Sequence, residues 1–251
     1  MPALAPRSAV DLHAIHADVW HAHALASAPL PVLATGDPAL DAQLPGGGWP
    51  IGALTEILQP PGVHSEWRLL LPALARCGHG PVVLVGAPHL PFAPALAAQG
   101  LAAQRLLWVT TPVAALRLWA CEQALRCAEV NAVLAWLPQA RSEQLRRLQM
   151  AAAEYSKLLF VMRPAAAQDE ASPAALRLHL QPLSSEAAPG VAAAPGTCAT
   201  PLQPLIDALQ LHLLKRRGPP LDQPLRLQAR GGRMNLLLAA AHALDCRTAR
   251  A

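Results

Sequence analysis

One stretch of this chain, from Thr35 to Pro72, constrains the fold more than any other. It begins as a polar turn, passes through a glycine-rich hinge and reaches an apolar run, ALTEIL, which predicts a strand. A loop rich in proline and glycine follows, and then a segment rich in leucine that predicts a helix. This order of strand, loop and helix is the layout in which phosphate-binding loops occur. The stretch therefore predicts the start of an α/β fold.

The same stretch resembles a known family. The sequence LPGGGWPIGALTEIL is similar to that of the ImuA family, which are RecA-like accessory proteins of translesion DNA synthesis in bacteria. The residues that look like the opening of a RecA-type core are Thr35-Gly36, Leu40-Asp41, the glycines at 46 to 48, Pro50, Gly52 and Glu56-Ile57. The resemblance covers the chain from about residue 30 to about residue 230. It implies an α/β, RecA-like core with a mostly parallel central sheet flanked by helices, an N-terminal helix, and a C-terminal β-hairpin plus helix.

The loop after the predicted strand departs from a working phosphate-binding loop. That motif, G-x-x-x-x-G-K-[ST], needs backbone N–H groups around the phosphates, a lysine to neutralise them and a hydroxyl for magnesium. Proline removes N–H donors, and a carboxylate at a helix N-terminus repels phosphate. Here the lysine and hydroxyl positions carry Ser65 and Glu66, so we expect no ordinary ATP binding and no nucleotide cofactor. The degenerate loop comprises Gln59, Pro60, Gly62, His64, Ser65 and Glu66, with Pro61 and Val63 between them.

Two further catalytic positions of the RecA-like family are replaced. Pro81–Gly86 predicts a buried strand, and the resemblance places a catalytic glutamate shortly after it, where this chain has Pro88. Asn131–Leu137 predicts another buried strand, and the resemblance places a magnesium-binding aspartate near its end, where this chain has Trp136. The sequence therefore predicts a protein that is not an enzyme.

Composition sets the class of protein and the compartment. Of the 251 residues, 53% are hydrophobic and 14% charged, which is typical of a globular chain. A net charge of +4 permits contact with nucleic acid or an acidic partner. There is no signal-peptide pattern and no run of about 18 apolar residues, so we expect a cytoplasmic protein without a membrane span. Reduced, buried thiols are expected for the five scattered cysteines, Cys77, Cys121, Cys127, Cys198 and Cys246.

Four parts of the chain are predicted. Residues 1–30 form an N-terminal docking helix, 31–182 the RecA-like core, 183–200 a flexible Ala/Pro/Gly linker, and 201–251 a C-terminal hairpin and helix that complete or extend the core. A helix from Ser8 would place several side chains on one face, namely His13, His16, Trp20 and His23. A metal site and a docking surface are both open for that face, and docking is favoured because no carboxylate or cysteine partner accompanies the histidines.

Within the core and hairpin, hydrophobic periodicity predicts the remaining elements. Helices are predicted over Glu66–Arg76, Pro94–Gln99, Pro112–Glu129 and Arg141–Ser156. Strands are predicted over Leu106–Val109, Lys157–Met162, Leu176–Leu180, Leu211–Gly218 and Leu225–Ala229, the last two around a Gly-Pro-Pro turn. A final helix after Gly232 is a candidate partner-binding helix.

Basic residues provide candidate contacts for DNA or for an acidic partner. Arg163 follows a predicted strand at the place where DNA-facing loops emerge in RecA-like cores. Lys215, Arg216 and Arg217 resemble the basic strand end that reaches across a RecA-type subunit interface. For both groups the alternative is an exposed basic side chain with no ligand. The full set of candidates is Arg163, Lys215, Arg216, Arg217, Arg230 and Arg233.

Other catalytic motifs are missing from the sequence. It has no G-x-S-x-G, no H-E-x-x-H and no paired cysteine spacing, so no metal site is predicted. Ser65 beside His64 gives a weak hydrolase hypothesis. Adjacent residues do not form a nucleophile and base pair, and no acidic residue can be assigned to orient them.

The resemblance implies a catalytically degenerate accessory protein of the SOS-induced, error-prone translesion synthesis of damaged DNA. The implied partners are ImuB, a polymerase-like adaptor, and the error-prone C-family DNA polymerase, with RecA and DNA as further candidates. One alternative is an atypical RecA-like ATPase that borrows Lys215 from a neighbouring subunit. Another is a cell division inhibitor similar to SulA, which would bind FtsZ.

Overall fold

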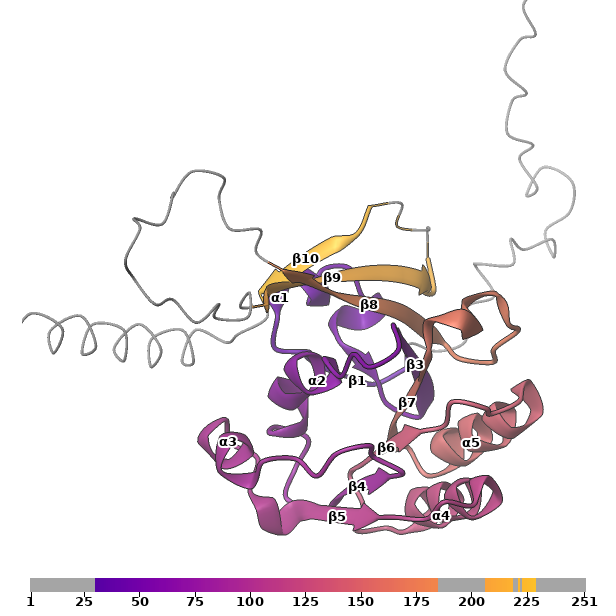
Figure 1. Ribbon diagram of the computed structural model, residues 1–251. Helices are drawn as coiled ribbons and strands as arrows, with labels where there is room; N and C mark the ends of the chain where they lie inside the picture. The colour runs from indigo at the N-terminus through magenta and orange to yellow at the C-terminus, as the bar shows by residue number, and fades with distance from the viewer. Residues whose placement is uncertain (1–29, 185–205, 219–220, 222, 229–251) are drawn as a thin grey trace, which may run out of the picture. The chain divides into compact units, whose positions relative to one another are not determined.

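The computed structural model describes residues 30–184, 206–218, 221 and 223–228, shown in Figure 1. The predicted N-terminal helix, residues 185–200 of the predicted linker and the final helix lie outside the described residues, as do Arg230 and Arg233. So do the four side chains of the predicted docking face, at 13, 16, 20 and 23.

The described residues form an α/β fold around an eight-stranded sheet, in the order β10-β9-β8-β3-β7-β6-β4-β5. Neighbouring strands from β8 to β5 run parallel, while β9 and β10 are added antiparallel beyond β8. The predicted fold class, with a mostly parallel central sheet flanked by helices, is confirmed and is consistent with a RecA-like core. The strands are β3 (Ala53–Gln59), β4 (Val82–Val85), β5 (Leu106–Val109), β6 (Ala132–Trp136), β7 (Leu158–Pro164), β8 (Leu176–Ser184), β9 (Ile206–Lys215) and β10 (Leu225–Gln228).

Helices cover both faces of the sheet (Figure 1). One face carries α2 (Glu66–Leu74) and α3 (Ala93–Ala98), and the other carries α4 (Ala114–Arg126) and α5 (Ser142–Glu154). The central strands β3, β4 and β6 are therefore buried along their whole length, which explains why β4 and β6 are apolar throughout and β3 mostly so, with Thr55, Glu56 and Gln59 as its polar residues. Parallel strands covered in this way leave their carboxyl ends as the edge on which ligands bind in α/β proteins.

The segment before β3 packs against the C-terminal part of α2. It contains the short pair β1 (Val32–Leu33) and β2 (Trp49–Pro50) and the one-turn helix α1 (Pro38–Asp41), capped by the Asp37 carboxylate. Gly36 has a φ of +98°, and a Cβ atom there would lie 2.6 Å from Cβ of Pro72 in α2. A side chain at Gly48 would collide with the carbonyl of Leu33. Close packing thus explains two of the glycines on which the family resemblance rests.

Two strands are longer than the sequence predicts. The ladder between β8 and β9 extends to the pair Ser184↔Ile206, whereas the predicted strands end at Leu180 and begin at Leu211. Residues 183 and 184 are therefore part of β8, which corrects the prediction that the linker begins at 183. Each extension is formed by pairing with the other strand, and alternation along a single strand does not reveal such a partner. Residues 185–205 lie between the two strands in sequence. Pairing of β8 with β9 joins the core sheet to the hairpin of β9 and β10.

The described cysteines are free thiols in different environments. Cys121 in α4 is buried, and desolvation raises the pKa of its thiol to about 12. Burial also raises the pKa of Cys77, against the opposing effect of Arg105. Cys127 is exposed because it lies just past the last turn of α4. This exposure corrects the expectation of buried thiols.

Across the part of the chain that the structure describes, none of the helices combines the length and the apolar character that a membrane crossing requires.

His179 and His212 form a cross-strand pair between β8 and β9, with ring centroids 6.0 Å apart. Burial and the neighbouring His212 lower the pKa of His179 below 6.5. The folded state therefore binds fewer protons than the unfolded state below this pH. We predict that the free energy of unfolding is highest above about pH 6.5 and falls as the pH drops through the folded-state pKa.

Chemical unfolding between about pH 8 and pH 5 measures this effect. The variant His212→Gln removes the like charge, so its stability should fall less over the same range. Equal pH dependence in the variant and the wild type would contradict the assignment.

Candidate functional site

The strand, loop and helix predicted for a phosphate-binding loop are present as β3, residues 60–65 and α2. The inside of the loop is filled by the chain itself. Gln59 Nε2 donates a hydrogen bond to Glu66 Oε2 at 2.8 Å, and the backbone N–H of Ser65 donates to Gln59 Oε1 at 2.8 Å. All three residues are buried. An amide and a carboxylate of the protein thus occupy the space beside the N-terminus of α2.

This arrangement changes the electrostatics of the helix terminus. A free helix N-terminus attracts anions through its unpaired N–H groups and its dipole. Here Glu66, the first residue of α2, puts a buried negative charge at that terminus. Ser65, at the position of the phosphate-binding lysine, has its N–H already bonded. The buried carboxylate of Glu66 at this terminus would repel a phosphate group.

A cavity of about 680 Å³ lies beside this loop, and we call it the edge cavity. It lies at the carboxyl ends of five neighbouring strands of the sheet, in the order β3, β7, β6, β4 and β5. The residues that line it are Gln59, Pro60, Pro61, Gly62, Val63, His64, Gly86, Ala87, Pro88, Thr110, Thr111, Pro112, Arg117, Trp136, Pro138, Met162, Arg163 and Pro164.

Every one of the five strand ends brings a proline to the edge cavity. These prolines are Pro60 after β3, Pro88 after β4, Pro112 after β5, Pro138 after β6, and Pro164 at the end of β7. Proline has no N–H group and a fixed φ. The sheet edge that would supply N–H donors to phosphates therefore presents rigid apolar rings.

The two predicted replacements, Pro88 and Trp136, both lie in the wall of the edge cavity. The described residues that line it include no carboxylate and no lysine. The chain has two lysines, and both are engaged elsewhere. Lys157 Nζ donates to the carbonyls of Ala128 and Val130 at 2.7 and 2.6 Å, and Lys215 Nζ donates to the carbonyl of Ser172 at 3.1 Å.

Two cationic or titratable groups of the edge cavity remain, besides Arg163. Arg117 of α4 donates from Nε to the carbonyl of Thr111 at 2.7 Å. His64 is exposed and packs edge to face against His89, with ring centroids 5.0 Å apart. The role of Arg117 is not evident from the sequence, because a single arginine on a predicted helix resembles any surface residue.

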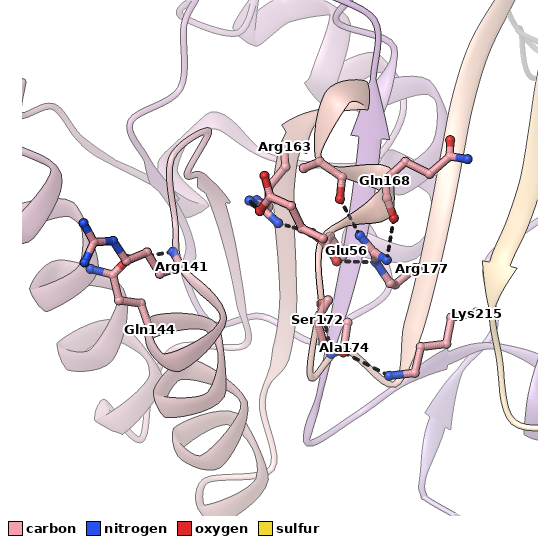
Figure 2. Close-up of polar contacts among 11 residues, drawn as sticks. Glu56, Arg141, Gln144, Arg163, Gln168, Ser172, Ala174, Arg177 and Lys215 are labelled. Carbon is pink, nitrogen blue, oxygen red and sulfur yellow. Dashed lines mark hydrogen bonds and ion pairs between the residues drawn. The ribbon is translucent and has the colours of Figure 1, made fainter.

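Arg163, a candidate DNA contact, is buried in an ion-pair network, shown in Figure 2. Its guanidinium donates to Glu56 Oε1 at 2.9 Å and to Glu170 Oε2 at 2.6 Å. Arg177 donates from Nε to the other oxygen of Glu56 at 2.7 Å. Burial opposes the charge on Arg163, but the bonds to Glu170 and Glu56 outweigh it and raise the pKa of Arg163. Only 2% of this side chain is exposed, which corrects the expectation of an exposed contact.

A sequence signal for this network exists in the run ALTEIL. A glutamate within a continuous apolar strand must be paired, because an isolated buried charge is very unfavourable. The partners are 107 and 121 residues further along the chain, so the signal predicts that a cation is needed without identifying it. The parallel register of β3 and β8 places Glu56 opposite Arg177, which identifies this arginine as one of the cations.

The basic end of β9 is tied to the core through two of its three residues. Lys215 bonds to Ser172, and Arg216 donates to the carbonyl of Gln43. Arg217 is exposed. Lys215 is exposed as well, whereas Arg216 is half-buried.

The hydrolase hypothesis for His64 and Ser65 is not supported, because Ser65 is buried and does not line the edge cavity. Among the described residues, no group of three or more His, Cys, Asp or Glu side chains could hold a metal ion.

Neither the comparison with protein-family models nor the comparison with curated proteins gives a match for this chain. The structure by itself defines an α/β protein with a large, mostly parallel central sheet flanked by helices. The carboxyl edge of that sheet carries a proline-lined cavity next to a loop that is closed by its own side chains.

We predict that Glu56→Gln lowers the free energy of unfolding by about 3 to 5 kcal/mol, since it leaves two buried arginines without their shared carboxylate. The matched control is Glu122→Gln, which breaks the pair with Arg147; the Arg147 side chain is 70% exposed, so the cation left unpaired is solvated, although Glu122 itself is 14% exposed. That change should cost less than about 1 kcal/mol. Denaturant unfolding of both variants measures the difference, and similar small losses would show that the Glu56 network is not a structural requirement.

Proposed function

We propose that this protein is a catalytically inactive, RecA-like accessory protein of SOS-induced, error-prone translesion DNA synthesis, which acts in the cytoplasm by binding other proteins in a mutasome. The observation that carries the proposal is the buried Gln59–Glu66 pair, which closes the loop that would hold a nucleotide. The translesion role rests on the ImuA resemblance of the segment that precedes and forms β3.

The pattern of what is kept and what is replaced supports a binding role. The glycines that allow close packing, such as Gly36 and Gly48, are kept, and so is the strand, loop and helix order. The positions that would carry lysine, glutamate and aspartate in an active relative have Ser65, Pro88 and Trp136. Binding requires the fold to persist but does not require the catalytic groups.

The ATPase alternative finds less support. It needs a lysine near the phosphates, and the amino group of Lys215 is bonded to Ser172 of its own core. It also needs an acidic metal ligand, and no carboxylate is found among the described residues that line the edge cavity.

An exposed apolar surface supports protein binding. Large hydrophobic side chains are exposed on the α4 side of β5, on α4 and on the turn between them, and we call this group the β5–α4 surface: Leu107, Val113, Leu116 and Trp119. In the described sheet β5 is an end strand, so its outer backbone groups are unpaired there (Figure 1). An apolar patch next to an open strand edge is typical of an interaction site.

ImuB, the polymerase-like adaptor implied by the resemblance, is the partner we assign to this surface. The C-family polymerase joins the assembly, and RecA and DNA are further partners, with Arg217 as the exposed basic contact.

Co-purification with ImuB tests the proposal. We expect Trp119→Glu to weaken binding about tenfold or more, because aromatic anchors dominate interface energies. Met150→Glu is the matched control, since Met150 on α5 is as exposed as Trp119, at 65% against 60%, and lies outside the β5–α4 surface. Both variants should unfold at similar temperatures.

Two results would count against this account. If the wild-type protein fails to bind ImuB but binds FtsZ, the cell division alternative takes its place. If Trp119→Glu and Met150→Glu bind ImuB equally, the β5–α4 surface is not the docking site.

A further inference from the structure

We infer that the edge cavity is a peptide-binding groove, which takes an extended segment of a partner protein with a carboxylate next to a large apolar side chain. The inference rests on the proposed function in one respect, namely that the site no longer serves a nucleotide. It goes further by naming the class of ligand that the edge cavity binds, a peptide segment with a carboxylate beside a large apolar side chain.

The cavity has the dimensions of a peptide groove. Its lining follows the ends of five adjacent strands, and strands lie about 4.8 Å apart, so these ends extend over roughly 19 Å. An extended peptide advances about 3.3 Å per residue, which allows five or six residues over roughly that length. The volume of about 680 Å³ is within the range of ligand sites in proteins, about 300 to 1,000 Å³.

The walls favour an apolar side chain. Each of the five strand ends at the cavity contributes a proline, and Ala87, Trp136 and Met162 add further apolar surface. Trp136 and Met162 lie at the ends of neighbouring strands and are buried by the surrounding protein, so they are already ordered. Rigid apolar walls bind a side chain without the cost of ordering the site.

Arg117 supplies the charge that selects a carboxylate. Its side chain packs over Gly86, where an added Cβ atom would lie 3.0 to 3.3 Å from the Cδ, Nε and Cζ atoms of Arg117. Its Nε is bonded to the carbonyl of Thr111, which fixes the orientation of the guanidinium. Within the described part of the chain, the two terminal nitrogens have no bonded partner. A positioned guanidinium with two free donors matches the two oxygens of a carboxylate.

The rest of the site leaves this charge uncompensated. Arg163 also lines the cavity, but Glu56 and Glu170 neutralise it. As the described lining has no carboxylate, Arg117 lacks a counter-ion there and attracts an acidic group from outside. A phosphate group suits the site less well, because the prolines remove N–H donors and Glu66 closes the neighbouring helix terminus.

Selection from a displayed library of random peptides on the full chain tests the inference. We expect the selected sequences to share an Asp or Glu beside a large apolar residue. A synthetic peptide with that sequence should bind Arg117→Gln about tenfold more weakly than wild type, through loss of the charge-assisted pair. The control is Arg126→Gln, an exposed arginine of the same helix outside the cavity, which should bind like wild type. Pro88→Trp, which fills the exposed side of the cavity, should abolish binding.

Two results would overturn the inference: no common sequence is selected, or the selected peptide binds Arg117→Gln and wild type equally. A parallel measurement of ImuB binding separates the two proposals. If ImuB binds wild type and Arg117→Gln equally and no peptide is selected, the groove is refuted and the proposed function stands. If peptides depend on Arg117 but ImuB does not bind at all, the groove stands and the proposed partner is wrong.

Discussion

The structure depends on one buried carboxylate. Glu56 lies in the middle of β3 and is bonded to Arg163 of β7 and Arg177 of β8, the strands on either side (Figure 2). Arg177 also donates to the carbonyls of Ala167 and Gln168, so the segment between β7 and β8 is held by the same group of charges. An unpaired charge in this core would cost several kcal/mol, and a shift in strand register would separate the partners. The network therefore fixes the register of the three central strands.

This fixed register determines what lies at the carboxyl edge of the sheet. Gln59 is the last residue of β3, three residues after Glu56, and its side chain bonds to both Ser65 and Glu66. The loop between strand and helix is therefore closed by groups whose positions follow from the sheet. The neighbouring strands bring prolines to the same edge. The strand, loop and helix order in which phosphate-binding loops occur is therefore present, but its helix terminus holds a buried carboxylate and the sheet edge carries prolines.

Much of the fold follows from the sequence. The apolar runs identify the buried strands, and β5 has the bounds that periodicity predicts, Leu106–Val109. The sequence places Pro88 shortly after one predicted buried strand and Trp136 near the end of another, and the structure brings both to the same edge of the sheet, in the wall of the edge cavity.

The rest depends on contacts between distant residues. Arg163 looks exposed in sequence, since proline and alanine follow it, but its partner Glu56 is 107 residues away. The five prolines form one wall only because the sheet aligns their strand ends. Arg117 reaches the cavity from α4, and the sequence of that helix has no polar face that would indicate which side is turned to the cavity. Predicting these features requires the order of the strands in the sheet, and the hydrophobic periodicity of a single segment does not reveal that order.

Thermal unfolding with and without ATP and magnesium in large excess tests whether the closed loop of this protein can hold a nucleotide. A ligand at about 100 times its dissociation constant stabilises a protein by about 2.7 kcal/mol, which is a clear rise in the unfolding temperature. The structure predicts no rise, because Gln59 and Glu66 fill the loop. A clear rise that is lost on changing Ser65 or Lys215 would show that a nucleotide binds at this loop and would favour the ATPase alternative.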